Sequence, residues 1–315
     1  MTLSIYLHIW SPTMQEAKAF APSHITGLFQ IMDQPKDPSH AGSRGAGVSL
    51  TRGVKTTVKI EKAQQGSITI SINGAISGSA RVSQAVADAY VSRAETTEQL
   101  AVSVEHEVDV PIGVGLGTSG AAALSLSIAL NQALDTGLSN NEAAQIAHVA
   151  EVKCGTGLGT VMAETHGGLE IRVTPGAPGI GEVRRMVAPD SMMVACIVYG
   201  PLSTRKILAD PVIRGRINEV GGKFVDQLVE RADVAHFMKL SRCFAEHVDL
   251  FTGKVRQTLD EIDRAGFVCS MPMFGEAVFT LIEKERIGQL LKVFRRFEGG
   301  KIIIADVDSA GARLL

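Results

Sequence analysis

The sequence predicts an α+β protein, and three observations support this fold class. The first part of the chain is rich in β-branched residues arranged as in the strands of a mixed sheet. Two long helical patterns follow, and the last part returns to strand, helix and strand, an order that suits a sheet with helices on one face. With 315 residues, 45% of them hydrophobic, the chain can supply a core to each of two domains.

The first part of the chain is predicted to form three strands, at residues 17–21, 54–60 and 67–72. Prolines and glycines at residues 35–47 indicate a turn-rich loop. A helix is expected at residues 82–100. Residues 102–110 then alternate valine with histidine or glutamate, so we expect another strand, which leads into a glycine-rich segment at residues 111–122.

Two consecutive helices are predicted next, at residues 121–134 and 140–153, and residues 139–142 supply a capping box for the second. Three glycines then end that helix, and Gly167-Gly168 predicts a tight turn into a strand. A Pro/Gly-rich connection places the domain boundary near residue 187, which gives domains 1–187 and 188–315. The second domain is expected to contain strands at 192–199, 277–282 and 301–305, a loop at 200–205, helices up to about residue 265 and a helix at 283–297.

The composition argues against several classes of protein. The net charge of −2 provides no basic surplus for a nucleic-acid backbone. No apolar run approaches the ~20 residues of a membrane helix, and residues 1–10 lack the pattern of a secretory leader. The four cysteines lie far apart, which favours reduced thiols over a metal site. We expect a cytoplasmic protein with a small-molecule substrate, and a homodimer is compatible with the sequence.

The glycine-rich segment carries the clearest functional signal. Four glycines within eight residues, between a strand and a helix, allow backbone N–H groups to face a phosphate chain, and the helix N-terminus adds its positive dipole. We therefore expect a phosphate site. Its predicted contacts are Pro111, Gly113, Gly115, Leu116, Gly117, Thr118, Ser119, Gly120 and Ala121.

Three other interpretations compete for this segment. A P-loop requires a lysine, and residues 111–134 contain none. A dinucleotide fingerprint matches the glycine spacing, but it requires a strand after the helix, where a second helix is predicted. A glycine-rich turn without a ligand is the remaining alternative.

The run Pro-x-Gly-x-Gly-Leu-Gly-Thr-Ser-Gly-Ala-Ala at residues 111–122 resembles the second motif of the GHMP kinases, which include galactokinase, homoserine kinase and mevalonate kinase. The resemblance implies ATP as a substrate and a two-domain fold, with a ribosomal-protein-S5-like N-terminal domain and a ferredoxin-like C-terminal domain. It also implies that Ser119 and Glu151 hold Mg²⁺. A solvated surface glutamate is the alternative for Glu151.

Further motifs in the chain resemble one family within the superfamily. Residues 19–27 resemble the first motif of the superfamily, and residues 269–276 resemble a third motif with fewer glycines. Together with the glycine-containing runs at 42–47, 155–160 and 200–204, they look like the archaeal pantoate kinases. This implies phosphorylation of the 4-hydroxyl of (R)-pantoate for coenzyme A synthesis. The substrate contacts then expected are Ser23, His24, Ser43, Arg44, His148, Arg172, Ser203 and Thr204, with Lys206 as a further anion contact.

Two of these contacts can also be argued from the residues themselves. His148 lies three residues before Glu151, so both project from one face of the predicted helix. Arg172 follows the tight turn on a strand, and a planar guanidinium suits a substrate carboxylate. A structural histidine and a solvated edge-strand arginine are the alternatives.

One position departs from the superfamily pattern. Kinases of the superfamily that use a catalytic base carry an aspartate where this chain has Thr160, which cannot act as a base. We therefore expect positioning, the metal and the γ-phosphate to carry the reaction, as in the homoserine kinase branch, with His148 as the fallback base. The alternatives are another acceptor, such as mevalonate, homoserine or shikimate, and a non-catalytic nucleotide sensor.

Overall fold

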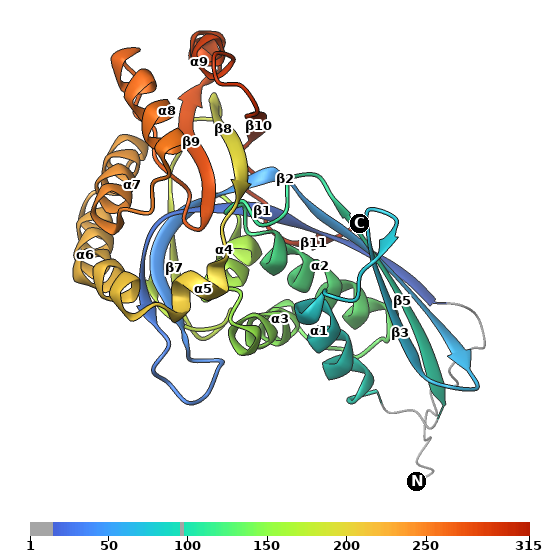
Figure 1. Ribbon diagram of the computed structural model, residues 1–315. Coiled ribbons are helices and arrows are strands. Elements are labelled where there is room, and N and C mark those ends of the chain that lie inside the picture. Colours follow the sequence, from blue (N-terminus) through green and yellow to red (C-terminus); the bar gives the residue numbers. More distant parts are fainter. Residues whose placement is uncertain (1–14, 95–97) are drawn as a thin grey trace.

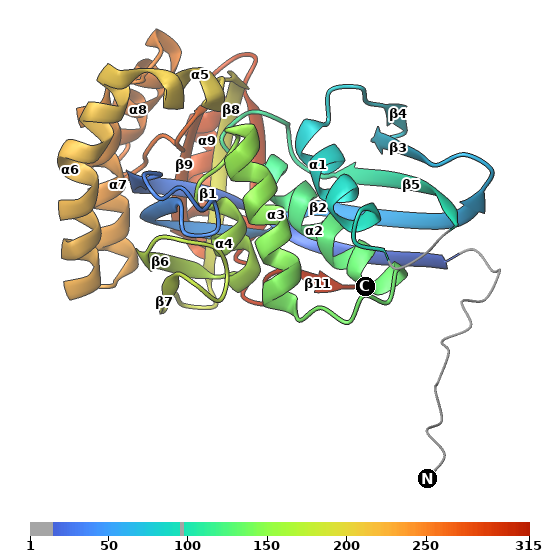
Figure 2. The ribbon, with the colours of Figure 1, turned by 90° about the horizontal axis from the view of Figure 1, so that it is seen from below.

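The computed structural model describes residues 15–94 and 98–315, and its strands form two sheets (Figure 1). The expectation for residues 1–10 lies outside this range. The larger sheet has the order β11-β1-β2-β5-β3-β4, with β6 and β7 attached to one end of β2; the smaller has the order β10-β8-β9. Helices α1, α2 and α3 cover one face of the larger sheet, and α6, α7 and α8 lie at the opposite end of the molecule (Figure 2).

The strands are β1 (Gln15–Met32), β2 (Gly42–Ala63), β3 (Ser67–Ile72), β4 (Ala75–Ile76), β5 (Gln99–Val108), β6 (Leu169–Thr174), β7 (Glu182–Met186), β8 (Met192–Pro201), β9 (Gly275–Glu283), β10 (Lys301–Asp306) and β11 (Arg313–Leu314). The α-helices are α1 (Arg81–Val91), α2 (Thr118–Ala133), α3 (Asn140–Cys154), α4 (Thr160–His166), α5 (Thr204–Ala209), α6 (Pro211–Glu230), α7 (Val234–Val248), α8 (Gly253–Arg264) and α9 (Ile287–Phe294).

Strands β1 and β2 form a long antiparallel ribbon that passes through both halves of the molecule. Register shifts occur after Pro22 and after Thr26, so the ribbon bends there without losing its pairing. Before the bends its apolar side chains belong to the core beneath α2; after them they pack with the C-terminal helices. The strand predicted at residues 17–21 is therefore much longer, and the predicted loop at 35–47 shrinks to residues 33–41.

The helix that carries the glycine loop is held on the sheet by a buried polar chain. His106 on β5 contacts the hydroxyl of Thr56 on β2 at 2.8 Å, and that hydroxyl contacts Ser125 of α2 at 2.6 Å. Ser125 in turn donates to the carbonyl of Ala121, in the first turn of α2. Burial lowers the pKa of His106 to about 4, so this chain is made of neutral groups.

The helices predicted around the glycine loop are confirmed with one change. Helix α3 directly follows α2, and Ser139 with Glu142 forms the predicted capping box. Helix α1 ends at Val91, whereas a helix had been expected through residue 100. Residues 99 and 100 instead begin β5, because their backbone pairs with β2; residues 95–97 lie outside the described part.

The C-terminal residues return to the larger sheet. Residue 187, the predicted domain boundary, lies between β7 and β8, which belong to different sheets. Beyond β10, however, the chain crosses back, and β11 pairs with β1. None of the described helices is both long and apolar enough to cross a bilayer.

Helix α6 approaches the β1–β2 ribbon closely at one glycine. A β-carbon on Gly221 would lie 2.1 Å from the carbonyl oxygen of Phe29 on β1, whereas one on Gly215, in the same helix, would meet nothing within 4 Å. The contact at Gly221 therefore sets the distance between the C-terminal helices and the ribbon.

We predict opposite effects for alanine at these two glycines. Gly221→Ala should lower the free energy of unfolding by about 1–3 kcal/mol, because the helix must move off the strand. Gly215→Ala should raise it by up to about 1 kcal/mol, since glycine is a poor helix residue and the space is open. Urea denaturation measures both; equal effects would show that α6 does not rest on β1 at Gly221.

Candidate active site

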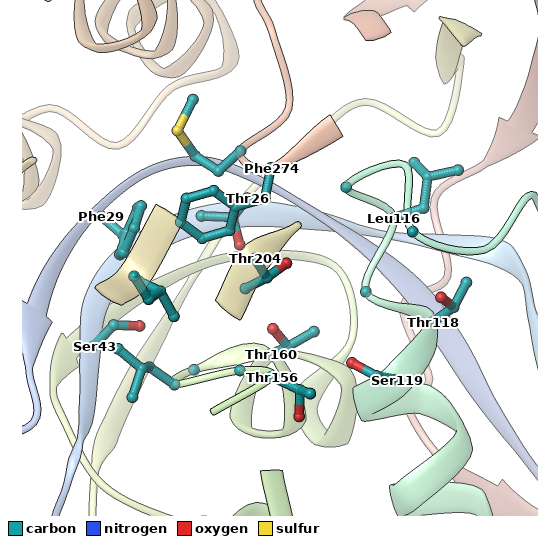
Figure 3. A pocket seen from close by; sticks show the side chains of 18 of the residues that line it. Thr26, Phe29, Ser43, Leu116, Thr118, Ser119, Thr156, Thr160, Thr204 and Phe274 are labelled. Atoms are coloured by element: carbon teal, nitrogen blue, oxygen red, sulfur yellow. The ribbon is translucent and has the colours of Figure 1, made fainter. Parts of the chain in front are cut away.

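A cavity opens where the glycine loop meets the far end of the β1–β2 ribbon, the 156–160 segment and α5 (Figure 3). Phe29 and Phe274 lie on one side of it, and Thr118 and Ser119 lie on the other. The lining residues are Thr26, Phe29, Ser43, Gly113, Gly115, Leu116, Gly117, Thr118, Ser119, Thr156, Gly157, Leu158, Gly159, Thr160, Arg172, Thr204, Leu208, Met273 and Phe274.

The glycine loop uses a backbone conformation that other residues rarely adopt. Gly113, Gly115 and Gly117 have φ angles of 81°, 79° and 67°. Gly117 is the N-cap of α2 and offers no side chain to the free N–H groups of the first helical turn. Those donors, together with the helix dipole, therefore face the cavity as an anion site.

Three distant segments hold this loop in place. Backbone N–H groups of His24 and Leu202 donate to loop carbonyls, on Leu116 and Gly113, at 3.1 Å each. The third segment is the turn before β9, where a β-carbon on Gly275 would lie 1.8 Å from the carbonyl oxygen of Val114. The loop is thus fastened to β1, to the end of β8 and to the residues that resemble the third motif.

The same turn supplies an apolar wall. Phe274 adopts a φ of 66°, unusual for a bulky residue. Its ring packs edge-on against Phe29 of β1, with centroids 5.6 Å apart and planes at 82°. With Leu208 and Met273, the two rings give the cavity one apolar side.

Ser119 and Glu151 meet at the base of the loop. Glu151 is 2% exposed, and its carboxyl accepts hydrogen bonds from Thr156, at 2.7 Å, and from the Ser119 hydroxyl. Burial raises the pKa of Glu151, while these two hydrogen bonds act in the opposite direction. Gly157 covers the carboxyl, since a β-carbon there would lie 2.0 Å from its Oε2.

Arg172 is the cation of the cavity. It is 1% exposed, and its guanidinium donates to Glu170, which also contacts the ring of His24 at 3.2 Å. Among the described groups, the Nε of Arg172 has no hydrogen-bond partner. A β-carbon on Gly159 would lie 2.8 Å from this nitrogen and 2.3 Å from the Ser43 hydroxyl, so both groups meet beneath Gly159.

The structure brings about half of the predicted site residues to the cavity wall. The predicted residues that line it are Ser43, Gly113, Gly115, Leu116, Gly117, Thr118, Ser119, Thr160, Arg172 and Thr204. The predicted residues behind or beside the wall are Pro111, Gly120, Ala121, Ser23, His24, Arg44, His148, Glu151, Ser203 and Lys206. Of these, Glu151 reaches the site through Ser119, and His24 through Glu170.

Three of the predicted substrate contacts have structural partners instead. His148 is buried and donates from Nε2 to the carbonyl of Ala41 at 2.9 Å. Arg44 donates to the carbonyl of Val173 and forms an ion pair with Asp226 of α6. Ser203 caps α5, accepting from the backbone N–H of Lys206. These placements favour roles in holding elements together over contact with a substrate.

Sequence reasoning missed two buried acids beside the site. Glu170 lies two residues before Arg172 on β6, so both share one face of the strand, and that spacing could have identified it. Glu164 lies one helical turn after Thr160 on α4 and is completely buried. Burial, with Glu151 nearby, raises the pKa of Glu164 well above its ordinary value.

The class of protein follows from comparisons with known families. The family model described as the GHMP kinases N terminal domain matches residues 80–168, which include the glycine loop, α2 and α3. A homoserine kinase structure from Cytophaga hutchinsonii superimposes with a TM-score of 0.68 at 18% identity, covering 98% of this chain and all of that one. The predicted α+β fold of this superfamily is confirmed.

Individual relatives identify one family within this superfamily. Pantoate kinase of Thermococcus kodakarensis is 35% identical over 284 residues, 87% of this chain and 91% of the relative. Pantoate kinase of Methanocaldococcus jannaschii is 30% identical over 277 residues, 88% of this chain and 96% of the relative. A structure described as a phosphotransferase related to the CoA biosynthesis pathway has a TM-score of 0.87 at 30% identity, covering 95% and 98% of the two chains. The chain belongs to the pantoate kinase family.

We predict that the turn before β9 supports nucleotide binding. Gly275→Ala should cost about 1–3 kcal/mol of stability and weaken binding of a non-hydrolysable ATP analogue, because the added methyl displaces the turn from the glycine loop. Calorimetric titration measures the affinity. Gly288→Ala in α9 is the matched control, since a β-carbon there meets nothing within 4 Å. Unchanged affinity in Gly275→Ala would separate the turn from the nucleotide site.

Proposed function

We propose that this protein transfers the γ-phosphoryl group of ATP to the 4-hydroxyl of (R)-pantoate, giving (R)-4-phosphopantoate. The observation that carries the proposal is the placement of Arg172. Its unpaired Nε lies beneath Gly159 at the cavity, where it can receive a carboxylate, while the glycine loop offers a phosphate site on the facing wall. Relatives named pantoate kinase, which match most of the chain, support pantoate over other hydroxy acids.

The nucleotide side of the site consists of the glycine loop and α2. GHMP kinases are ATP-dependent, and the free N–H groups at the start of α2 suit the phosphates of that nucleotide. Ser119 and Glu151 fit Mg²⁺: they are adjacent oxygen donors, and this ion usually takes few protein ligands and completes its shell with phosphates and water. When bound, Mg²⁺ offsets the charge that develops on the phosphates.

The acceptor side combines one cation with hydroxyls and an apolar wall. Arg172 is proposed to bind the pantoate carboxylate, with the Ser43 hydroxyl beside it. Pantoate carries two methyl groups on one carbon, and the rings of Phe29 and Phe274 present the matching apolar surface. Thr204 comes from α5 and lies on the same cavity, so we propose that it contacts an acceptor hydroxyl.

The proposed mechanism relies on alignment. Thr160 lines the cavity but carries no basic group, and His148 is engaged with the carbonyl of Ala41 behind the wall. Neither position supports a side-chain base. The hydroxyl proton of pantoate therefore passes to a γ-phosphate oxygen, while Arg172 and the glycine loop hold the two substrates in line.

The remaining expectations are carried forward as parts of the proposal. We propose that residues 1–187 bind the nucleotide and that residues 188–315 cover the acceptor with α5 and the turn at Phe274. The product then enters coenzyme A synthesis, as the description of the structural neighbour suggests for that protein. A cytoplasmic location is proposed with it.

ADP release, coupled to NADH oxidation, tests the function directly. Turnover with pantoate should exceed that with mevalonate, homoserine and shikimate. ATP binding without ADP release from any of the four would instead identify a nucleotide sensor, and preference for another acceptor would reassign the substrate.

We predict that Ser119→Ala and Glu151→Gln each lower kcat by at least ~100-fold, because each removes a group that stabilises charge on the transferred phosphoryl. Steady-state kinetics at saturating ATP measure this. The matched control is Glu142→Gln, an exposed glutamate on the same helix as Glu151. A variant at position 119 or 151 with near-normal kcat would remove that residue from the metal site.

We predict that alanine at Gly159 and at Gly157 acts on different substrates. Arg172→Ala would strand the buried Glu170 without its cation, so the neighbouring glycines are the better probes. Gly159→Ala crowds Arg172 and Ser43 and should raise KM for pantoate. Gly157→Ala crowds Glu151 and should raise the Mg²⁺ requirement. Initial-rate kinetics with each substrate varied distinguish the two; parallel effects would contradict the division of the cavity.

A further inference from the structure

Glu164 is a buried acid on which Arg172 acts through space but which no described group hydrogen-bonds. Its side chain projects from α4 one turn after Thr160 and is 0% exposed. Neither carboxyl oxygen makes a hydrogen bond within the described chain. Buried carboxyls are normally paired or hydrogen-bonded, because leaving one bare costs free energy. A side chain kept in this state suggests a partner that arrives with a ligand.

The carboxyl of Glu164 lies directly under the start of the glycine-loop helix. A β-carbon on Gly117 would be 2.6 Å from its Oε1, and one on Gly120 would be 2.8 Å from its Oε2. These two glycines flank Ser119, the proposed metal contact, in the first turn of α2. Thr160 contacts the same two positions, so it lies between the acid and the cavity edge.

The charges around this point do not balance. Glu151, Glu164 and Glu170 are three buried carboxyls, and Arg172 is the one buried guanidinium among them. With all four ionised the group carries a formal charge of −2, and Glu170 already pairs with Arg172. The remaining negative charge lies mainly on Glu151 and Glu164, which repel each other, while Arg172 acts on Glu164 only through space.

We propose that Glu164 is the second carboxylate of the divalent cation site, which it forms with Ser119 and Glu151. The inference rests on the proposed function, because the cation enters with the nucleotide. Within residues 15–94 and 98–315, no three acidic, histidine or cysteine side chains gather as a complete metal cluster. With the cation bound, Glu164 would supply a second negative charge behind Ser119 and Glu151, which would hold the ion together with the nucleotide phosphates.

The position of Glu164 relative to Thr160 sets its depth. Glu164 lies on the same face of α4, one turn further from the cavity edge that Thr160 lines. A carboxylate at this depth reaches the loop from below, so it contributes charge without contacting the pantoate hydroxyl. Glu164 is thus a metal-positioning residue.

Mn²⁺ binding, followed by electron paramagnetic resonance in the presence of a non-hydrolysable ATP analogue, tests the proposal. Glu164→Gln keeps the shape of the side chain and removes its charge. It should weaken Mn²⁺ binding by about 10- to 100-fold. Glu182→Gln, an exposed acid on β7 that pairs with Arg184, is the matched control and should bind as the wild type does.

Thermal unfolding provides a second readout that a structural role would not move in the same direction. In chelator, Glu164→Gln should have a Tm at least equal to that of the wild type, because the Glu164 carboxyl has no hydrogen-bond partner among the described residues that the substitution could remove. The increase in Tm on adding Mg²⁺ and the analogue should be smaller than in the wild type. A lower Tm in chelator together with wild-type Mn²⁺ affinity would overturn the proposal and make Glu164 a structural acid.

The outcomes also separate this inference from the proposed function. Tight Mn²⁺–nucleotide binding in the wild type and in Glu164→Gln alike would refute the role of Glu164 and leave the kinase assignment intact. Failure of the wild type itself to bind the metal with the nucleotide would overturn both.

Discussion

The whole site depends on bare backbone at the glycine loop. Gly115 lies against Met273 and Gly275, and Gly117 lies against the carboxyl of Glu164, with no room for a β-carbon at either place. Because these segments approach so closely, the loop cannot relax away from α2, and the N–H groups of the first turn stay directed at the cavity. A phosphate site of this kind is formed by exclusion of side chains as much as by any group that contacts the ligand.

Local signals in the sequence predicted the elements that local interactions form. The capping box at Ser139 and the strand-to-helix setting of the glycine loop depend on neighbouring residues, and both are present. The length of β1 and β2 depends on pairing between distant segments, so the glycines at the start of β2 suggested a loop where the strand has already begun. The predicted end of α1 at residue 100 was wrong for the same reason, because residues 99 and 100 pair with β2 and belong to β5.

The candidate site shows the same division between local and tertiary signals. Ser43 and Arg44 are neighbours on β2, yet only Ser43 faces the cavity, because successive side chains of a strand point to opposite faces. Helical spacing placed His148 on the same face as Glu151. In the structure, however, the ring of His148 is hydrogen-bonded to the carbonyl of Ala41, in the 33–41 segment, and does not reach the cavity. Glu164 belongs to no recognisable sequence motif. Its place beneath the glycine loop follows from the packing of α4, which only the folded structure shows.

The return of the chain to β1 has a consequence for how the molecule is assembled. The carbonyl of Asp308 accepts from Gly168 at 2.6 Å, at the turn that introduces Glu170 and Arg172, and Ala312 donates to the carbonyl of Glu164 at 3.0 Å. Residues 308–314 therefore complete the scaffold of acids and arginine that lies some 140 positions earlier in the chain. A chain cut before residue 308 would lack one strand of the larger sheet and the backbone contacts that hold the turn before Glu170 and Arg172.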